Sequence, residues 1–136
     1  MKPLIYLDTS VALAHLFVED RQPGADLWRN SLVTSRLLEY ELWIRLHARG
    51  LTESHGDAAR QLLSRLAFIE LAPAVLARAL EPFPVAVRTL DALHLASVDF
   101  LRSSKQTVVL ATYDTRMADA ARALGFALHD PDGGAA

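Results

Sequence analysis

Cysteine is absent from this chain of 136 residues. Its absence excludes disulfide bonds, thiolate nucleophiles and zinc sites built on cysteine, and it fits a reducing cytoplasm. No apolar stretch approaches the length of a membrane span, and the opening MKPLIYLDTS lacks the layout of a signal peptide because Asp8 interrupts its apolar run. We therefore expect a cytoplasmic protein.

A positive net charge is also missing. The chain carries a formal net charge of −2, which argues against bulk, non-specific binding to nucleic acid but leaves room for a local basic patch. Only Lys2 and Lys105 among the 14 basic residues are lysine. The arginine that makes up the rest suits phosphate recognition, because its planar fork binds two oxygens at once, although a GC-rich genome would produce the same bias.

What the sequence does contain is a regular alternation of predicted strands and helices. This alternation predicts an α/β fold with a central, mainly parallel sheet. We expect one domain over residues 1–130 and a flexible tail at 131–136. The expected strands cover 3–7, 32–35, 68–71, 106–113 and 126–130, and the expected helices cover 10–17, 24–31, 36–50, 54–66, 74–81, 86–103 and 115–125.

Two aspartates directly follow apolar strand segments. Asp8 stands in LDTS and Asp114 in YDTR, each before Thr and the start of a helix. In parallel sheets, sites form in the crevice beyond the carboxyl ends of the strands, so two such aspartates on neighbouring strands would meet there. The alternative for either one is a helix N-cap, or a charge that faces the helix dipole.

Glu41 and Asp91 stand on predicted helices. Glu41 borders the apolar stripe of SRLLEYELWIRLH, where the alternative is an ion pair with Arg45 one turn later. Asp91 shares one helix face with apolar residues, where an unpaired charge is costly. The alternative for Asp91 is a partner in Arg88 or Arg102.

Four carboxylates that cannot each be paired imply a cation. Oxygen ligands of this hardness suit Mg²⁺ or Mn²⁺ rather than zinc. His94, one turn after Asp91, is expected to be a packed, hydrogen-bonded helix residue. The other histidines show no ligand spacing: His15, His47, His55 and His129.

Four segments together resemble the PIN-domain family, and within it the VapC-type toxins of bacterial toxin–antitoxin modules. They are LDTSVAL, SRLLEYELWIRL, LDALHLAS and ATYDTRMADAARALGF, and the likeness runs from about residue 3 to about residue 129. The resemblance implies a PIN-like three-layer α/β/α fold. It places the family's catalytic and metal-binding acids at Asp8, Glu41, Asp91 and Asp114, and an auxiliary hydroxyl at Thr112.

The resemblance also implies an activity and partners. These are Mg²⁺- or Mn²⁺-dependent endoribonuclease cleavage of RNA such as tRNA or ribosomal RNA, a cognate VapB-type antitoxin and a homodimer. The arginines that could steer phosphate, unless they are simply solvated, are Arg36, Arg45, Arg88 and Arg116.

Other functions remain open. One is a non-catalytic PIN-like binding domain, against which the intact acid set argues. Another is a PIN nuclease of RNA processing outside a toxin–antitoxin module. A third alternative, a phosphotransfer domain, is not supported. The haloacid-dehalogenase kind expects a second aspartate where Ser10 stands, a receiver domain expects an acidic pair at the first strand and a late lysine after a strand, and neither pattern is present. No glycine-rich phosphate loop is found either.

Large apolar residues gather in the first helices. They predict either ordinary core packing or a surplus that forms a groove for an antitoxin segment. The residues are Phe17, Leu27, Trp28, Leu42, Trp43 and Leu46.

Overall fold

The structure is a computed structural model that describes residues 2–18 and 21–133. Its elements, in chain order, are β1 (Leu4–Leu7), α1 (Thr9–Phe17), the 3₁₀-helix η1 (Ala25–Arg29), β2 (Leu32–Ser35), α2 (Arg36–Ala48), α3 (Thr52–Ser64), β3 (Leu66–Ile69), α4 (Pro73–Ala79), α5 (Thr89–Ser103), β4 (Val108–Ala111), α6 (Thr115–Ala123) and β5 (Ala127–His129). None of the helices in this described part combines the length and apolar character that a bilayer crossing requires.

The five strands form one sheet in the order β3-β2-β1-β4-β5, and every neighbouring pair is parallel. The predicted α/β class is confirmed, with an all-parallel rather than a mainly parallel sheet. The chain adds β2 and β3 on one side of β1 and then crosses over to add β4 and β5 on the other. The strand order therefore reverses between β1 and β4, which is where open α/β sheets place their ligand crevice.

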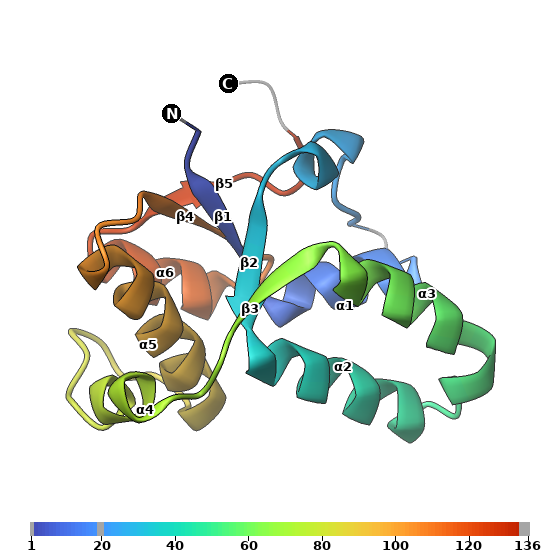
Figure 1. Cartoon of the computed structure of the whole chain (residues 1–136), viewed down its shortest axis with the longest axis horizontal. Coiled ribbons are helices and arrows are strands. Elements are labelled where there is room, and N and C mark those ends of the chain that lie inside the picture. Colours follow the sequence, from blue (N-terminus) through green and yellow to red (C-terminus); the bar gives the residue numbers. More distant parts are fainter. Residues whose placement is uncertain (1, 19–20, 134–136) are drawn as a thin grey trace.

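Helices cover both faces of the sheet, as the predicted three-layer arrangement requires. Figure 1 shows α1, α2 and α3 on one side and α4, α5 and α6 on the other. Successive residues of a strand point to opposite faces, so Ile5 and Leu7 join the core under α1–α3, whereas Tyr6 joins the core under α5 and α6. The central strand is thus buried on both sides.

Several expected boundaries were wrong. The strand expected at 106–113 covers only Val108–Ala111. The helix expected at 24–31 is the short η1. The strand expected at 68–71 lies two residues earlier, because β3 pairs in register with β2 from Leu66 opposite Leu32 onward. The helix expected from 86 begins at Thr89, because the backbone of Arg88 is extended. Asp91 consequently lies in the first turn of α5 rather than in its second.

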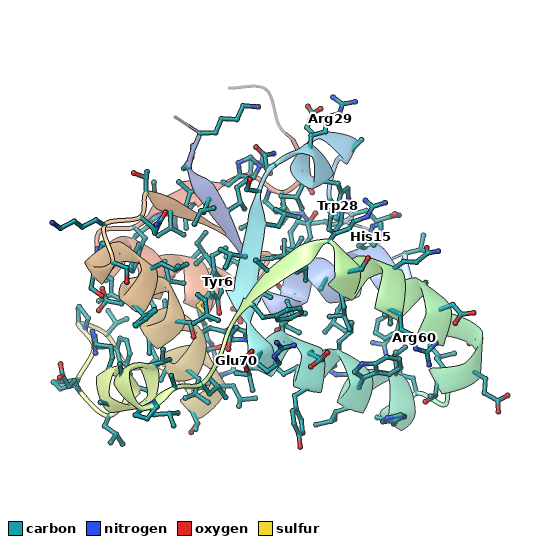
Figure 2. The ribbon with its side chains drawn as sticks, viewed as in Figure 1. Tyr6, His15, Trp28, Arg29, Arg60 and Glu70 are labelled. Carbon is teal, nitrogen blue, oxygen red and sulfur yellow. The ribbon has the colours of Figure 1, made fainter. Side chains whose placement is uncertain are left out.

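Core packing accounts for the large apolar residues of the first helices. Leu27, Leu42 and Leu46 are fully buried, and the aromatic residues pack against the same core. The ring of Trp28 lies 4.7 Å from that of His15 (Figure 2). The exposed large apolar residues of α2 are instead Tyr40 and Ile44.

The segment 131–133, expected as the start of the tail, contacts the loop after α1. Gly24 N–H donates to the carbonyl of Pro131 (2.8 Å), and Arg21 forms an ion pair with Asp132 (2.9 Å). The hydroxyl of Tyr113 donates to the same carboxylate (2.6 Å). The rest of the expected tail, 134–136, lies outside the described residues.

Candidate active site

The crevice between β1 and β4 is a cavity of ≈ 490 Å³. Asp8 follows β1 directly, and Asp114 follows β4 after two further residues. The two strand ends are joined, because Asp8 N–H donates to the carbonyl of Ala111 (3.0 Å). Glu41 of α2 and Asp91 of α5 line the same cavity, so the fold brings all four sequence-predicted acids to one place.

Two hydroxyl groups hold the buried carboxylate of Asp8. Ser10 Oγ and Thr112 Oγ1 both donate to Asp8 Oδ2, each at 2.7 Å. Thr112 Oγ1 also accepts from the backbone N–H of Asp114 (3.0 Å), so it links the two strand-end aspartates. This contact gives the hydroxyl at Thr112 a physical role beside the acids; that of Ser10 was missed from the sequence.

The helix-cap alternative holds for one of the two strand-end aspartates. Asp114 Oδ1 accepts from the backbone N–H of Arg116 (2.9 Å) and caps α6. Asp8 occupies the corresponding position before α1 but makes no side-chain cap bond there. Asp114 therefore caps a helix while it lines the cavity, whereas the carboxylate of Asp8 serves the cavity alone.

Asp91 is half-buried and has like charges for neighbours. Burial raises its pKa, and the charges of Asp114 and Asp8 raise it further. Arg88 lines the same cavity, and its charge opposes the rise without forming an ion pair in the described residues. The suggested partner Arg102 is bound elsewhere, 2.9 Å from Asp99.

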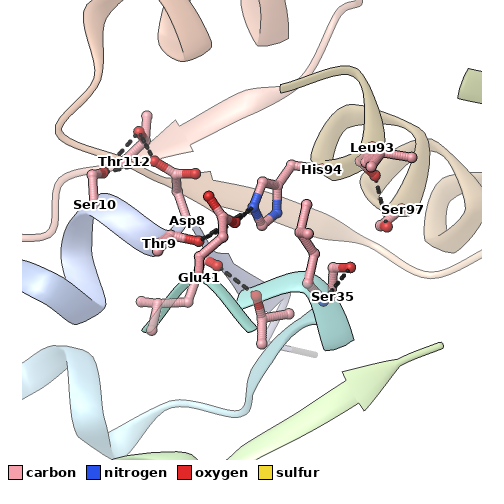
Figure 3. A network of polar contacts seen from close by, with 12 residues as sticks. Asp8, Thr9, Ser10, Ser35, Glu41, Leu93, His94, Ser97 and Thr112 are labelled. Atoms are coloured by element: carbon pink, nitrogen blue, oxygen red, sulfur yellow. Dashed lines mark hydrogen bonds and ion pairs between the residues drawn. The ribbon is translucent and has the colours of Figure 1, made fainter. Parts of the chain in front are cut away.

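Glu41 is held across the cavity rather than along its own helix. Its Oε1 accepts from Thr9 Oγ1 (2.9 Å) and lies 2.7 Å from His94 Nε2 (Figure 3). Arg45 lines the cavity, but no ion pair joins it to Glu41 in the described part of the chain. The contacts of Glu41 are thus to α1 and α5, and not to Arg45 as in the alternative reading of the sequence.

His94 is a packed, hydrogen-bonded helix residue, as predicted. Its side chain is 2% exposed, and its Nδ1 lies 2.7 Å from the hydroxyl of Tyr6. Burial lowers the pKa of His94, but the hydrogen bond with Glu41 and the charges of Asp8, Glu41 and Asp91 outweigh burial and leave the pKa raised. The sequence did not indicate that its other nitrogen would meet an acid of the cavity.

The four arginines considered for phosphate separate into two groups. Arg45 and Arg88 line the acidic cavity, and Arg88 and Arg116 line an adjoining cavity of ≈ 260 Å³ beside Asp91. Arg36 forms ion pairs with Glu70 (2.7 Å) and Glu39 (3.4 Å), so its charge is already engaged.

The donor chemistry of the cavity fits a divalent cation, although the side chains are not drawn together around one. Asp8, Asp91 and Asp114 supply hard carboxylate oxygens, and burial together with the charges of Asp114 and Asp8 raises the pKa of Asp91. Among the residues described, no three His, Asp or Glu side chains stand close enough to hold a metal ion. The site therefore suits a divalent cation because of its unpaired negative charge, and not because its ligands are already arranged around one.

The sequence model of the PIN domain matches residues 5–123. The chain belongs to the PIN-domain family. Three ribonucleases of Mycobacterium tuberculosis are similar to it over almost the full length of both chains. The sequence identity is 38% with VapC46, 33% with VapC35 and 30% with VapC47. The alignments cover 93% of this chain for VapC46 and 94% for the other two, and they cover 97% of each relative.

A solved toxin and chains of two solved complexes share the fold. The toxin VapC20 of M. tuberculosis, described as cleaving the sarcin–ricin loop, superimposes with a TM-score of 0.68 at 20% identity, covering 93% of this chain and 99% of its own. A chain of VapBC2 from Rickettsia felis, solved with a promoter DNA fragment, gives 0.68 at 16% identity, covering 93% and 97%. A toxin–antitoxin complex from Klebsiella pneumoniae gives 0.61 at 16% identity, covering 96% and 98%.

Proposed function

We propose that this PIN-domain protein is a metal-dependent endoribonuclease and the toxin of a VapBC-type toxin–antitoxin module. The observation that carries the proposal is the convergence of Asp8, Glu41, Asp91 and Asp114 on one cavity where the strand order reverses. Similarity to ribonucleases named VapC over nearly the whole chain supports the same activity.

Asp8, Asp91 and Asp114 would hold Mg²⁺ or Mn²⁺, and Glu41 would hold a second ion or orient the attacking water. A bound cation would lower the pKa of a water molecule and polarise the scissile phosphodiester. Thr112 and Ser10 keep Asp8 in place by donating to Oδ2. Glu41 Oε1 is already hydrogen-bonded, so the proton of the attacking water would go to Glu41 Oε2.

Arg45 and Arg88 would bind the phosphates of the substrate. Both line the acidic cavity, and their charges would offset the repulsion between RNA phosphates and four carboxylates. Arg116 would extend this contact past Asp91 through the adjoining cavity. With a net charge of −2, the chain offers RNA a local rather than a general attraction.

The remaining parts of the proposal follow the relatives. The substrate would be an exposed loop or single-stranded stretch of tRNA or ribosomal RNA, the partner a cognate VapB-type antitoxin, and the active form a cytoplasmic homodimer. The neighbours solved as toxin–antitoxin complexes support the antitoxin.

The test is cleavage of total tRNA and ribosomal RNA with Mg²⁺, with Mn²⁺ and with EDTA. We expect cleavage only with metal, and loss of cleavage in Asp8→Asn, Asp91→Asn and Asp114→Asn. Asn can still cap α6, so Asp114→Asn should remain folded. We expect Glu41→Gln to reduce RNA cleavage by as much as the three asparagine variants or by less.

Asp119→Asn is the matched control, because Asp119 is an exposed residue of α6 that pairs with Arg122. It should cleave like the wild type. Wild-type protein that cleaves neither RNA with either metal would point to the non-catalytic alternative. Cleavage in vitro without growth arrest on expression would point to an RNA-processing nuclease outside a toxin–antitoxin module.

A further inference from the structure

A buried chain of hydrogen bonds reaches the acidic cavity from the core of the protein. It starts at the backbone N–H of Ser35, which donates to the hydroxyl of Tyr6 (3.2 Å). It continues through Tyr6 to His94 Nδ1 (2.7 Å) and from His94 Nε2 to Glu41 Oε1 (2.7 Å). The chain thereby links β1, the start of α2 and α5 to one carboxylate. Figure 3 shows its last contact, between His94 and Glu41.

We infer that His94 is a positioning residue that fixes Glu41 for the reaction, an inference that rests on the proposed ribonuclease function. Glu41 is a half-buried residue of α2, and its long side chain has several rotamers available. His94 comes from α5 on the opposite face of the sheet and is 2% exposed. A buried, rigid ring of this kind removes the freedom that the glutamate would otherwise have.

The direction of the hydrogen bond between His94 and Glu41 does not depend on the charge of His94. Tyr6 accepts from Ser35 N–H and keeps its own proton, because burial raises its pKa. In the neutral ring, the Tyr6 hydroxyl donates to Nδ1, which places the ring proton on Nε2. In the imidazolium both nitrogens carry protons. In both forms Nε2–H donates to Glu41 Oε1.

Thr9 adds a second donor to the same oxygen. Its Oγ1 donates to Glu41 Oε1 (2.9 Å) and lies 3.2 Å from His94 Nε2, so the ring N–H reaches both. With two donors on Oε1, Glu41 Oε2 is the oxygen left to act in the cavity. Supporting partners of this kind commonly affect metal affinity or activity by about 10- to 100-fold.

The first test compares His94→Leu with His94→Gln. Leucine fills the space without a donor, whereas the amide nitrogen of glutamine can replace Nε2. We expect kcat to fall by about 10- to 100-fold in His94→Leu with little change in KM, and glutamine to restore part of it. Mn²⁺ affinity measured by calorimetry should weaken about tenfold in His94→Leu and recover in His94→Gln.

Two controls separate positioning from simple loss of stability. Val98→Ala empties buried space one turn further along α5 without touching Glu41, so it should lower the melting temperature and leave kcat unchanged. In a Glu41→Gln background, His94→Leu should cause little further loss of kcat, because the residue it positions is already disabled.

Unchanged kcat and Mn²⁺ affinity in His94→Leu would overturn the inference. So would losses that add fully in the double variant, or an equal loss of kcat in Val98→Ala. If the wild type cleaves no RNA, the proposed function fails by itself. The Mn²⁺ affinities of the two His94 variants would still decide whether His94 positions Glu41.

Discussion

Asp91 is the residue where opposing electrostatic effects meet. Its place in the first turn of α5 favours a negative charge, by about 0.3–1 kcal/mol when exposed. Burial and the charges of Asp114 and Asp8 disfavour the negative charge and raise the pKa of Asp91. An acid whose pKa is raised on folding destabilises the folded state at pH values above its unfolded pKa, so neutral pH is where this residue is costly.

We therefore expect Asp91→Asn to melt at or above the wild type in EDTA at neutral pH. Asparagine keeps the shape of the side chain and removes the repulsion. A cation that binds only the folded wild type adds about 2.7 kcal/mol at a hundred times its dissociation constant, and the variant should lose most of this gain. Thermal melts of both proteins with Mn²⁺ and with EDTA measure both effects. A variant that is clearly less stable in EDTA yet responds fully to Mn²⁺ would make Asp91 a structural residue.

Single residues also show how far sequence reasoning extends. Asp8 and Asp114 could be located because each follows an apolar strand, which is a local signal. The contact between His94 and Glu41 could not, because it joins helices on opposite faces of the sheet across 53 positions. Spacing along a helix reports neighbours one turn away, such as Arg45, and carries no information on a partner from another helix.

At the scale of elements, the docking of α4 on α5 depends on Asp99. Its Oδ2 accepts from Arg78 Nε (2.7 Å) and its Oδ1 from Arg102 Nη2 (2.9 Å). Burial raises the pKa of Asp99, but the hydrogen bonds from Arg78 and Arg102 outweigh burial and leave the pKa lowered. An acid whose pKa is lowered on folding stabilises the protein above its unfolded pKa, and that stability is lost as the pH falls through the folded value.

Asp99→Asn should consequently behave in the opposite way to Asp91→Asn on the same helix. We expect a loss of about 1–3 kcal/mol at pH 7, because the hydrogen bonds to a charged acceptor are weakened. The difference from the wild type should shrink as the pH falls below the ordinary range for aspartate and the wild-type carboxyl also becomes protonated. Urea unfolding across this range measures it, and a difference that is constant with pH would contradict the assignment.

Element boundaries were harder to predict than element types. The alternation of strand-like and helix-like sequence patterns predicted every strand of the sheet. The position of β3, however, depends on its register with β2, which is a contact between distant segments. The start of α5 depends on an extended residue, Arg88, that carries no side-chain cap bond. Local sequence patterns therefore could not predict the position of β3 or the start of α5.

At the scale of the whole molecule, the C-terminal segment 131–133 meets the loop after α1 at Gly24. A Cβ atom at this position would stand 2.8 Å from the carbonyl oxygen of Asp132. Gly24→Ala should therefore push the segment 131–133 away and weaken the bond from Gly24 to Pro131. We expect a loss of about 1–3 kcal/mol, as for other overpacked sites.

Gly56→Ala is the comparison. Gly56 lies in α3, and the nearest atom to an added Cβ is the flexible end of Arg60 at 3.5 Å. Alanine should stabilise this helix by roughly 0.5–1 kcal/mol. Denaturant unfolding of both variants measures these opposite changes in the free energy of unfolding. A Gly24→Ala protein as stable as the wild type would show that the segment 131–133 can move away without loss of stability.

The strand order also governs when the acidic cavity can exist during synthesis. β1 can pair with β2 early, but its other neighbour, β4, is made only after α5. A nascent chain that has released three strands therefore holds Asp8 and Glu41 beside an exposed edge of β1, with no opposite wall. Non-local parallel pairing of this kind folds slowly. On the ribosome the acidic cavity would thus stay incomplete until the last quarter of the chain has emerged, and its second wall would be added only at that late stage.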